Sequence, residues 1–235
     1  MEPMRISGKD LGAVSMPGFC PRCFWVQRRA PAGLPYQIFP GIFSSIDSYT
    51  KNVVHGWFDR HGKPPDWLSP LGDIIGYIQP PHFSKFSFVD SKTGILLTGA
   101  PDAVFNLRDK TILIGDYKTA KFTKNQDTLL PIYQTQLNAY ALIAEKTGLG
   151  KVSKLALIYA EPVTDKSVAN TDEVHQNKGF NMGFSAHILP IELNTSSIPI
   201  LLKRTKQILD LELPPKGVAG CKDCEKLKGI IAILR

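Results

Sequence analysis

Hydrophobic residues recur along this chain with two spacings, one typical of helices and one typical of strands. Apolar side chains three or four positions apart predict helices over about 45–58, 128–146 and 197–211. Ser7, followed three residues later by Asp10, has the pattern of a capping box and predicts another, shorter helix near the N-terminus. The chain therefore alternates helical segments with other kinds of structure.

Compact or alternating apolar runs, bounded by turn residues, predict strands between these helices. They lie at 82–89, 94–107, 111–118, 154–160 and 179–193. The order of elements is helix, strands, helix, strand, strand, helix. This order predicts an α/β protein with a central mixed β-sheet flanked by helices.

The composition agrees with one folded unit. The chain has 235 residues, of which 43% are hydrophobic and 21% charged, so it can form one full core and we expect a single domain over 1–235. No run of about 18 apolar residues predicts a membrane span, and the first ten residues lack the pattern of a secretory signal. We expect a cytoplasmic protein with no membrane partner.

The formal net charge is +7, which bears on the kind of partner. A basic surplus favours polyanions, because it attracts phosphates and releases their counterions. Charge alone is a moderate signal for nucleic acid, so the chemistry has to come from particular residues.

Two aspartates are brought together if the segments 94–107 and 111–118 form a hairpin. With residues 108–110 as its turn, position 107 faces 111 and, counting outward, Asp102 faces Asp116. Lys118 lies two residues beyond Asp116 and therefore points to the same face of the strand.

Two carboxylates that are forced together repel each other unless a cation lies between them. Oxygen ligands of this kind suit Mg²⁺ or Mn²⁺, which polarise a phosphate and help to generate hydroxide from bound water. A nearby lysine can orient that water or offset the charge of the transition state. The alternative is a surface hairpin with a solvated ion pair. The apolar strand that ends at Asp116 and the Pro101–Asp102 dipeptide opposite favour the site.

The same residues carry a family resemblance. Pro101-Asp102, thirteen intervening residues and then Asp116-Tyr117-Lys118 resemble the signature of the PD-(D/E)XK nucleases. The resemblance implies a restriction-endonuclease-like core in which Asp102 and Asp116 are metal ligands, with the backbone carbonyl of Tyr117 as a possible third. It implies that Lys118 is the catalytic lysine.

A second motif resembles one branch of this superfamily. Gln136 and Tyr140 share one helix face and match the QxxxY motif of the RecB-type branch, which includes CRISPR-associated exonucleases and the nuclease domains of helicase–nuclease complexes. In that branch they would help to hold the substrate strand or the lysine. Taken alone, the pair could also be a half-buried, hydrogen-bonded tyrosine.

The resemblance implies a Mg²⁺- or Mn²⁺-dependent deoxyribonuclease, expected to be an exonuclease in DNA repair, recombination or CRISPR-type DNA processing. The expected partner is DNA with single-stranded character, and a helicase or integrase could work beside it. The alternative is a catalytically silent nucleic-acid-binding or scaffold protein of the same fold.

One feature departs from the branch, which often has a metal-binding histidine near the start of a helix. Here the helix around 45–58 carries Asp47 near its start, and Asp47 is the preferred ligand. His55, two turns further on, is the alternative, although a histidine on a helix surface needs no metal.

Four cysteines form two CxxC pairs, Cys20 with Cys23 and Cys221 with Cys224. In a reducing compartment such pairs indicate metal ligands rather than disulfides. The resemblance implies a 4Fe-4S cluster, although the branch typically has one cysteine before the core and three after it. Four thiolates can equally bind Zn²⁺. We expect 1–40 and 212–235 to form a small metal subdomain that joins the termini.

Basic and aromatic residues stand beside the first cysteine pair. Arg22, Arg28 and Arg29, interleaved with Phe24 and Trp25, could follow a single strand by charge and stacking, and Arg22 is our candidate substrate-binding residue. The alternative is a helix whose aromatic residues lie in the core and whose arginines face water.

Overall fold

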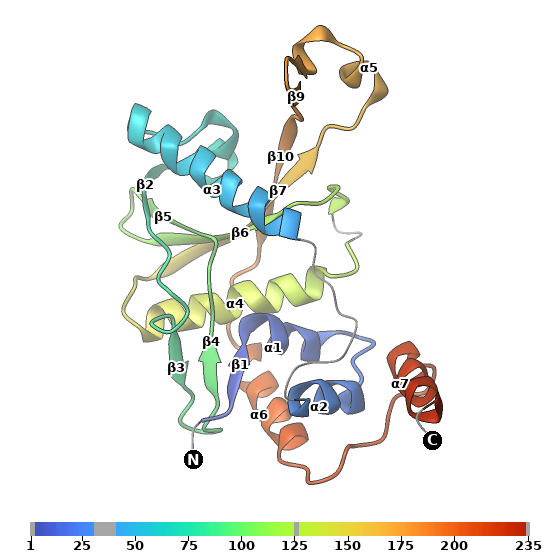
Figure 1. Ribbon diagram of the computed structural model, residues 1–235. Helices are drawn as coiled ribbons and strands as arrows, with labels where there is room; N and C mark the ends of the chain where they lie inside the picture. The colour runs from blue at the N-terminus through green and yellow to red at the C-terminus, as the bar shows by residue number, and fades with distance from the viewer. Residues whose placement is uncertain (1–2, 31–40, 125–126, 234–235) are drawn as a thin grey trace.

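A mixed five-stranded sheet forms the centre of the computed structural model, which describes residues 3–30, 41–124 and 127–233 (Figure 1). The strands stand in the order β10, β7, β6, β5, β2. Only β6 and β7 are parallel among these neighbours, and the other pairs are antiparallel. Their bounds are β2 (Ile74–Ile78), β5 (Ala103–Leu107), β6 (Ile112–Lys118), β7 (Val152–Pro162) and β10 (Phe184–Ile191). The sheet confirms the predicted mixed α/β class.

Helices cover both faces of this sheet. The helices are α1 (Gly8–Ser15), α2 (Pro21–Arg29), α3 (Gly41–His61), α4 (Leu130–Lys146), α5 (Lys166–Ala169), α6 (Ser197–Leu209) and α7 (Lys222–Ile233), with 3₁₀ turns η1 (Asp66–Leu71) and η3 (Asp172–Val174). α4 makes the crossover between the parallel strands β6 and β7 and packs on one face with α1 and α6. The opposite face packs against Val54 and Phe58 of α3 and against η1.

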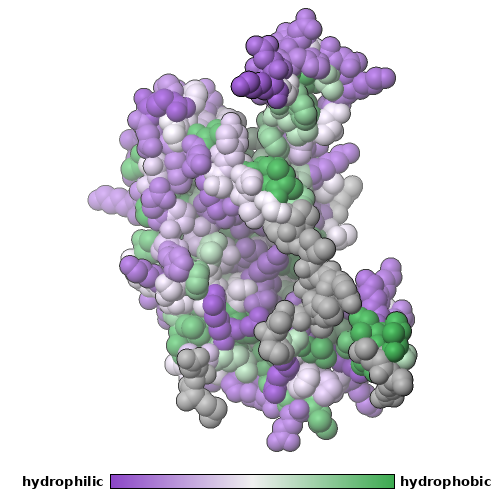
Figure 2. Space-filling model, in the orientation of Figure 1, coloured by the Kyte–Doolittle hydropathy of each residue, from purple (hydrophilic) through white to green (hydrophobic). Residues whose placement is uncertain are grey.

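Two small sheets accompany the main one. β4 (Leu96–Thr98) lies between β1 (Arg5–Ser7), to which it is parallel, and β3 (Ser87–Val89), to which it is antiparallel. β8 (His175–Gln176) and β9 (Gly179–Phe180) pair in the insertion between β7 and β10. In Figure 1 this insertion stands out from the body, and Figure 2 shows that its tip is hydrophilic.

The N-terminal helix follows the predicted capping box. The side chain of Ser7 accepts from the backbone N–H of Asp10, and the carboxylate of Asp10 accepts from the backbone N–H of Ser7, both at 3.1 Å. α1 then lies so close to α4 that a Cβ on Gly12 would be 2.6 Å from the carbonyl oxygen of Ile132. A glycine is therefore required where these two helices meet.

The prediction of one strand over 94–107 is wrong. This segment forms β4 and β5, which belong to different sheets, with 99–102 between them. Pro101 has no N–H for a sheet ladder, and Gly99 passes against the ring of Tyr140, where a Cβ would be 2.7 Å from two ring carbons. The break leaves Asp102 directly before β5.

The second CxxC leads into a C-terminal helix, since α7 begins at Lys222. No helix in the described part of the chain is both long enough and apolar enough to cross a membrane.

Candidate active site and cysteine cluster

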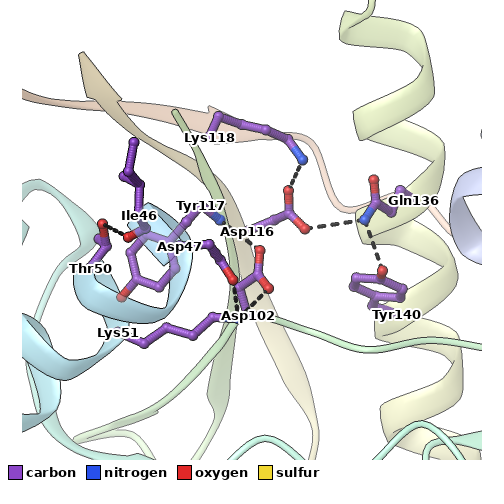
Figure 3. A network of polar contacts seen from close by, with 10 residues as sticks. All are labelled: Ile46, Asp47, Thr50, Lys51, Asp102, Asp116, Tyr117, Lys118, Gln136 and Tyr140. Carbon is purple, nitrogen blue, oxygen red and sulfur yellow. Dashed lines mark hydrogen bonds and ion pairs between the residues drawn. The ribbon is translucent and has the colours of Figure 1, made fainter. Parts of the chain in front are cut away.

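The hairpin of β5 and β6 has the predicted register. Ala103 pairs with Gly115 and Asn106 with Ile112, so one step further the same register puts Asp102 opposite Asp116. The backbone N–H of Tyr117 donates to Oδ2 of Asp102 at 3.1 Å. Figure 3 shows the two carboxylates near each other, with Asp116 on β6 and Asp102 directly before β5.

Asp116 is almost fully buried and has two partners. Its Oδ2 forms an ion pair with Nζ of Lys118, while its Oδ1 accepts from Nε2 of Gln136 at 3.1 Å. The same Nε2 lies 2.8 Å from the hydroxyl of Tyr140, to which it donates. Tyr133 of α4 packs against the other side of the lysine, with its ring centre 4.2 Å from Nζ. α4 therefore orients both the carboxylate and the lysine of β6.

Asp102 is linked to α3 by a lysine that the sequence interpretation did not single out. Nζ of Lys51 lies 2.8 Å from Oδ1 of Asp102 and 2.8 Å from Oδ2 of Asp47 (Figure 3). Lys51 is four residues after Asp47, so the two side chains share a helix face. That spacing is the signal from which Lys51 could have been found.

Burial and charge act on the pKa values of this network. Burial, followed by the nearby charge of Asp116, raises the pKa of Asp102 above its usual range, and Lys51 opposes this shift. Burial also disfavours the charged form of Lys51, but the carboxylates of Asp102 and Asp47 outweigh it and raise the pKa of the lysine. The positive charge of the lysines therefore offsets the repulsion between the neighbouring carboxylates.

The three aspartates, but not Lys51, line one open cavity of about 580 Å³. Its lining includes Asp47, Asp102, Asp116, Lys118 and Gln136. The donor set is rich in carboxylate oxygens and suits Mg²⁺ or Mn²⁺. A divalent ion at Asp47 and Asp102 would take the place that the ammonium of Lys51 holds now.

His55 does not line this cavity. Its ring stacks on Tyr77 with 4.0 Å between the centres and an interplanar angle of 5°. Burial in this stack lowers the pKa of His55. Of the two candidates on α3, Asp47 is the one beside Asp102.

The residues around the first CxxC belong mainly to the packing of α2. Phe24 is buried in the core, and Nε1 of Trp25 donates to the carbonyl of Leu211 at 3.0 Å. Arg28 pairs with Asp10 at 3.3 Å, and Arg29 donates to the carbonyl of Leu209 at 2.9 Å.

Arg22 lies beside the cysteines, in a depression lined by Gly217, Cys221 and Cys224, rather than in the carboxylate cavity. Its predicted role in substrate binding remains a prediction.

The four cysteines converge, although about 200 residues separate the two pairs. All four sulfur atoms lie within 4.8 Å of one another, with Cys20 Sγ 3.6 Å from Cys224 Sγ and Cys23 Sγ 3.4 Å from Cys224 Sγ. They join the start of α2 to the start of α7. A metal held by these thiols would therefore connect the two ends of the chain.

Local hydrogen bonds favour the thiolate form of Cys20. Burial opposes ionisation of Cys20, but backbone hydrogen bonds from Cys23 and Val218 outweigh it and lower its pKa to about 6. Burial and the neighbouring cysteines raise the pKa of Cys23. Metal binding would reverse this second effect, because a metal ion stabilises thiolates.

The mixed sheet flanked by helices defines a fold of the restriction-endonuclease type, in which the opposed aspartates and the adjacent lysine line one cavity. The sequence model of the PD-(D/E)XK nuclease superfamily matches residues 62–226, and the chain belongs to this superfamily. Among solved structures, the chain is similar to one titled "Crystal structure of SSO0001", with 16% identity and a TM-score of 0.43 over 92% of this chain and 81% of that one. No curated protein matches it.

Proposed function

We propose that this protein is a Mg²⁺- or Mn²⁺-dependent nuclease that hydrolyses DNA phosphodiester bonds. The observation that carries the proposal is the position of Asp102 opposite Asp116, with Lys118 ion-paired to Asp116 at the edge of an open cavity. Asp47, Asp102 and Asp116, with the backbone carbonyl of Tyr117, would hold the metal. When bound, that metal would polarise the phosphate and lower the pKa of water.

The protein's own residues have separate tasks in this proposal. The ammonium of Lys118 would orient the attacking water and stabilise the charge that develops on the phosphate oxygens. Gln136 holds Asp116 through Nε2, while its buried Oε1 has no hydrogen-bond partner among the described residues. That oxygen could accept a hydrogen bond from the water. Tyr140 keeps the amide of Gln136 in place.

We further propose DNA with single-stranded character as the substrate, and an exonuclease role in DNA repair, recombination or CRISPR-type processing, beside a helicase or integrase. The net charge of +7 supports a polyanionic substrate. An open cavity at the end of β6 supports access for a strand rather than a small molecule.

A cleavage assay tests the activity. Single-stranded and duplex DNA and RNA, labelled at the 5′ or 3′ end, would be incubated with Mg²⁺, Mn²⁺ or EDTA. We expect metal-dependent shortening of DNA from an end and no product in EDTA. Products that persist in EDTA would exclude the metal-dependent reaction.

The second candidate is a nucleic-acid-binding protein of the same fold that does not cut. The ion pairs of Lys51 with both Asp47 and Asp102 favour it, because they occupy two proposed ligands. DNA binding without cleavage under any metal condition would identify this second function.

For the cysteines we propose a metal centre, which is the 4Fe-4S cluster that the resemblance implies or, as the alternative that the shortest sulfur distances favour, one tetrahedrally coordinated Zn²⁺ ion. Four thiolates that each lie 2.3 Å from a single ion are about 3.8 Å apart. The closest sulfur pairs here are 3.4 to 3.6 Å apart. In a four-iron cluster each thiolate binds a different iron, which spreads the sulfurs further. We also propose that 1–40 and 212–235 act as one metal subdomain, of which 1–2, 31–40 and 234–235 lie outside the described residues.

A further inference from the structure

A second cavity lies on the far side of α3 from the carboxylates. It has a volume of about 350 Å³ and is enclosed by α3, by Trp67 of η1 and by the neighbouring strands β7 and β10. This volume is at the lower end of the range for small-ligand sites.

The walls of this cavity are aromatic and aliphatic. Tyr49 from α3 and Phe184 from β10 are 66% and 38% exposed, so both rings are accessible at its mouth. Val53 and Ile158 form part of the apolar wall, and none of its lining residues is charged. Figure 2 shows hydrophobic surface where β7 and β10 pass α3. The cavity suits a flat, uncharged group.

The cavity and the candidate active site have neighbouring lining residues on two elements, although they share none. Tyr49 lies on the same turn of α3 as Asp47 and Lys51, the two residues that meet Asp102. On the sheet, Ile158 is the register partner of Tyr117, which stands between Asp116 and Lys118. The two cavities therefore lie near each other, on opposite sides of α3.

We propose that this cavity receives an unpaired nucleobase of the substrate, next to the phosphate held at Asp102 and Asp116. The inference rests on the proposed nuclease function and adds a site for a base, which would favour a single-stranded or frayed polynucleotide. Every base has a flat face that stacks on aromatic side chains regardless of sequence. A base in a duplex would first have to leave its stack, at a cost of a few kcal/mol, so the cavity selects strands that are already unpaired.

The test is a binding titration of the full-length protein in EDTA, with fluorescence anisotropy of a labelled single-stranded oligonucleotide. Tyr49→Ala is expected to raise the Kd about 5- to 150-fold, the range that corresponds to the loss of one base–aromatic stack. Tyr49→Phe keeps the ring and should bind like the wild type. Phe83→Ala is the matched control, because Phe83 is 40% exposed but lines neither cavity.

A series of oligonucleotides, each with one abasic position, identifies the occupant. One position should weaken binding to the wild type and have no effect on Tyr49→Ala, since the variant has already lost that contact. Thermal melting of each variant controls for folding, and because Tyr49 is an exposed residue the melting temperature should not change.

The outcomes separate the two proposals. If the wild type binds and cleaves DNA while Tyr49→Ala binds as tightly as the wild type, the base site is overturned and the nuclease proposal stands. Equal losses on single-stranded and duplex DNA would also overturn it. If the wild type binds no oligonucleotide and cleaves none, both proposals fail together.

Discussion

The ammonium of Lys51 contacts the carboxylates of Asp47 and Asp102 at once. A divalent ion bound by these two carboxylates, as we propose, would compete with the lysine. Burial and the charge of Asp116 raise the pKa of Asp102, while the charges of Lys51 and Lys118 oppose this shift. The lysine would keep the metal-free site neutralised and would move aside when the ion binds.

Removing that lysine should strengthen metal binding. In Lys51→Met the ion no longer has to displace an ammonium, and we expect the Kd for Mn²⁺ to fall about fivefold, equal to an ion pair worth about 1 kcal/mol. Calorimetric titration measures it. Lys63→Met, which removes only an exposed pair with Asp66, is the control and should leave the Kd unchanged. Weaker Mn²⁺ binding by Lys51→Met would instead make the lysine a supporting part of the metal site.

His55 should contribute a pH-dependent part of the stability. Burial lowers its pKa in the folded protein, so the unfolded chain binds the proton more readily. Its stabilising contribution is present above the unfolded pKa of about 6.5 and is lost as the pH falls below that value. His55→Gln should therefore lose less stability than the wild type between pH 7 and pH 5 in urea unfolding. An identical pH dependence would contradict the role of the stack on Tyr77.

For individual residues, the sequence predicted those contacts that follow from spacing along the chain. A three-residue turn determined which residues of β5 and β6 are paired, so the opposition of Asp102 and Asp116 could be counted out before the structure was known. The contact of Lys51 with Asp102 could not be counted in this way, because it joins α3 to a residue 51 positions away, directly before β5. Such a contact depends on packing between elements and has no local pattern.

Among the helices, α4 supplies the side chains that contact both Asp116 and Lys118 of the candidate site. It supplies Gln136 and Tyr133 to the carboxylate and lysine of β6, and its other side packs against α1. The position of α4 depends on the close contact at Gly12, where a methyl group would overlap backbone atoms that cannot rotate away. A change at this helix contact would therefore be transmitted to the site.

Gly12→Ala should accordingly destabilise the protein by about 1 to 3 kcal/mol, the usual cost of overpacking. Gly229→Ala is a matched helical control, because nothing lies within 4 Å of a Cβ at Gly229 in α7. Higher helix propensity should make that control neutral or slightly stabilising. Urea unfolding compares the two variants. A Gly12→Ala protein as stable as the wild type would show that α1 and α4 can separate at little cost.

The helices and strands were predictable in unequal measure. Long periodic segments such as 128–146 and 197–211 gave helices close to their observed bounds, because burial on one face repeats every three or four residues. The break between β4 and β5 was missed because it comes from the contact of Gly99 with Tyr140, 41 residues further on. The three-residue strand β1 was missed because its pairing with β4 is parallel and distant in sequence.

For the whole molecule, the cysteines link the two ends of the chain. α7 packs beside α2 (Figure 1), and the first pair of cysteines reaches the second pair at that point. Trp25 and Arg29 of α2 donate hydrogen bonds to the carbonyls of Leu209 and Leu211, which connect α2 to the end of α6. A metal at the cysteines would hold α7 where few other contacts do.

Removal of that metal should release the C-terminal segment. After chelation, or in Cys224→Ser, we expect trypsin to cut within 216–228 at least ten times faster, while the rest of the chain stays protected. Elemental analysis and absorption near 400 nm identify the metal, since a 4Fe-4S protein is brown and a zinc protein colourless. Unchanged proteolysis after complete metal loss would show that α7 is held by packing alone.

In the proposed reaction Lys118 has the most direct role, because its charge would act on the phosphate itself. The decisive measurement is the rate of metal-dependent DNA cleavage by Lys118→Met, with Lys92→Met, an exposed lysine in the turn before β4, as the matched control. We expect the control to cleave DNA at the wild-type rate. The cleavage rate of Lys118→Met should fall at least about 100-fold, the scale of losing one stabilising charge in a transition state. The melting temperature and DNA affinity of Lys118→Met should be nearly unchanged. A folded Lys118→Met protein that cleaves DNA at the wild-type rate would contradict the proposed active site.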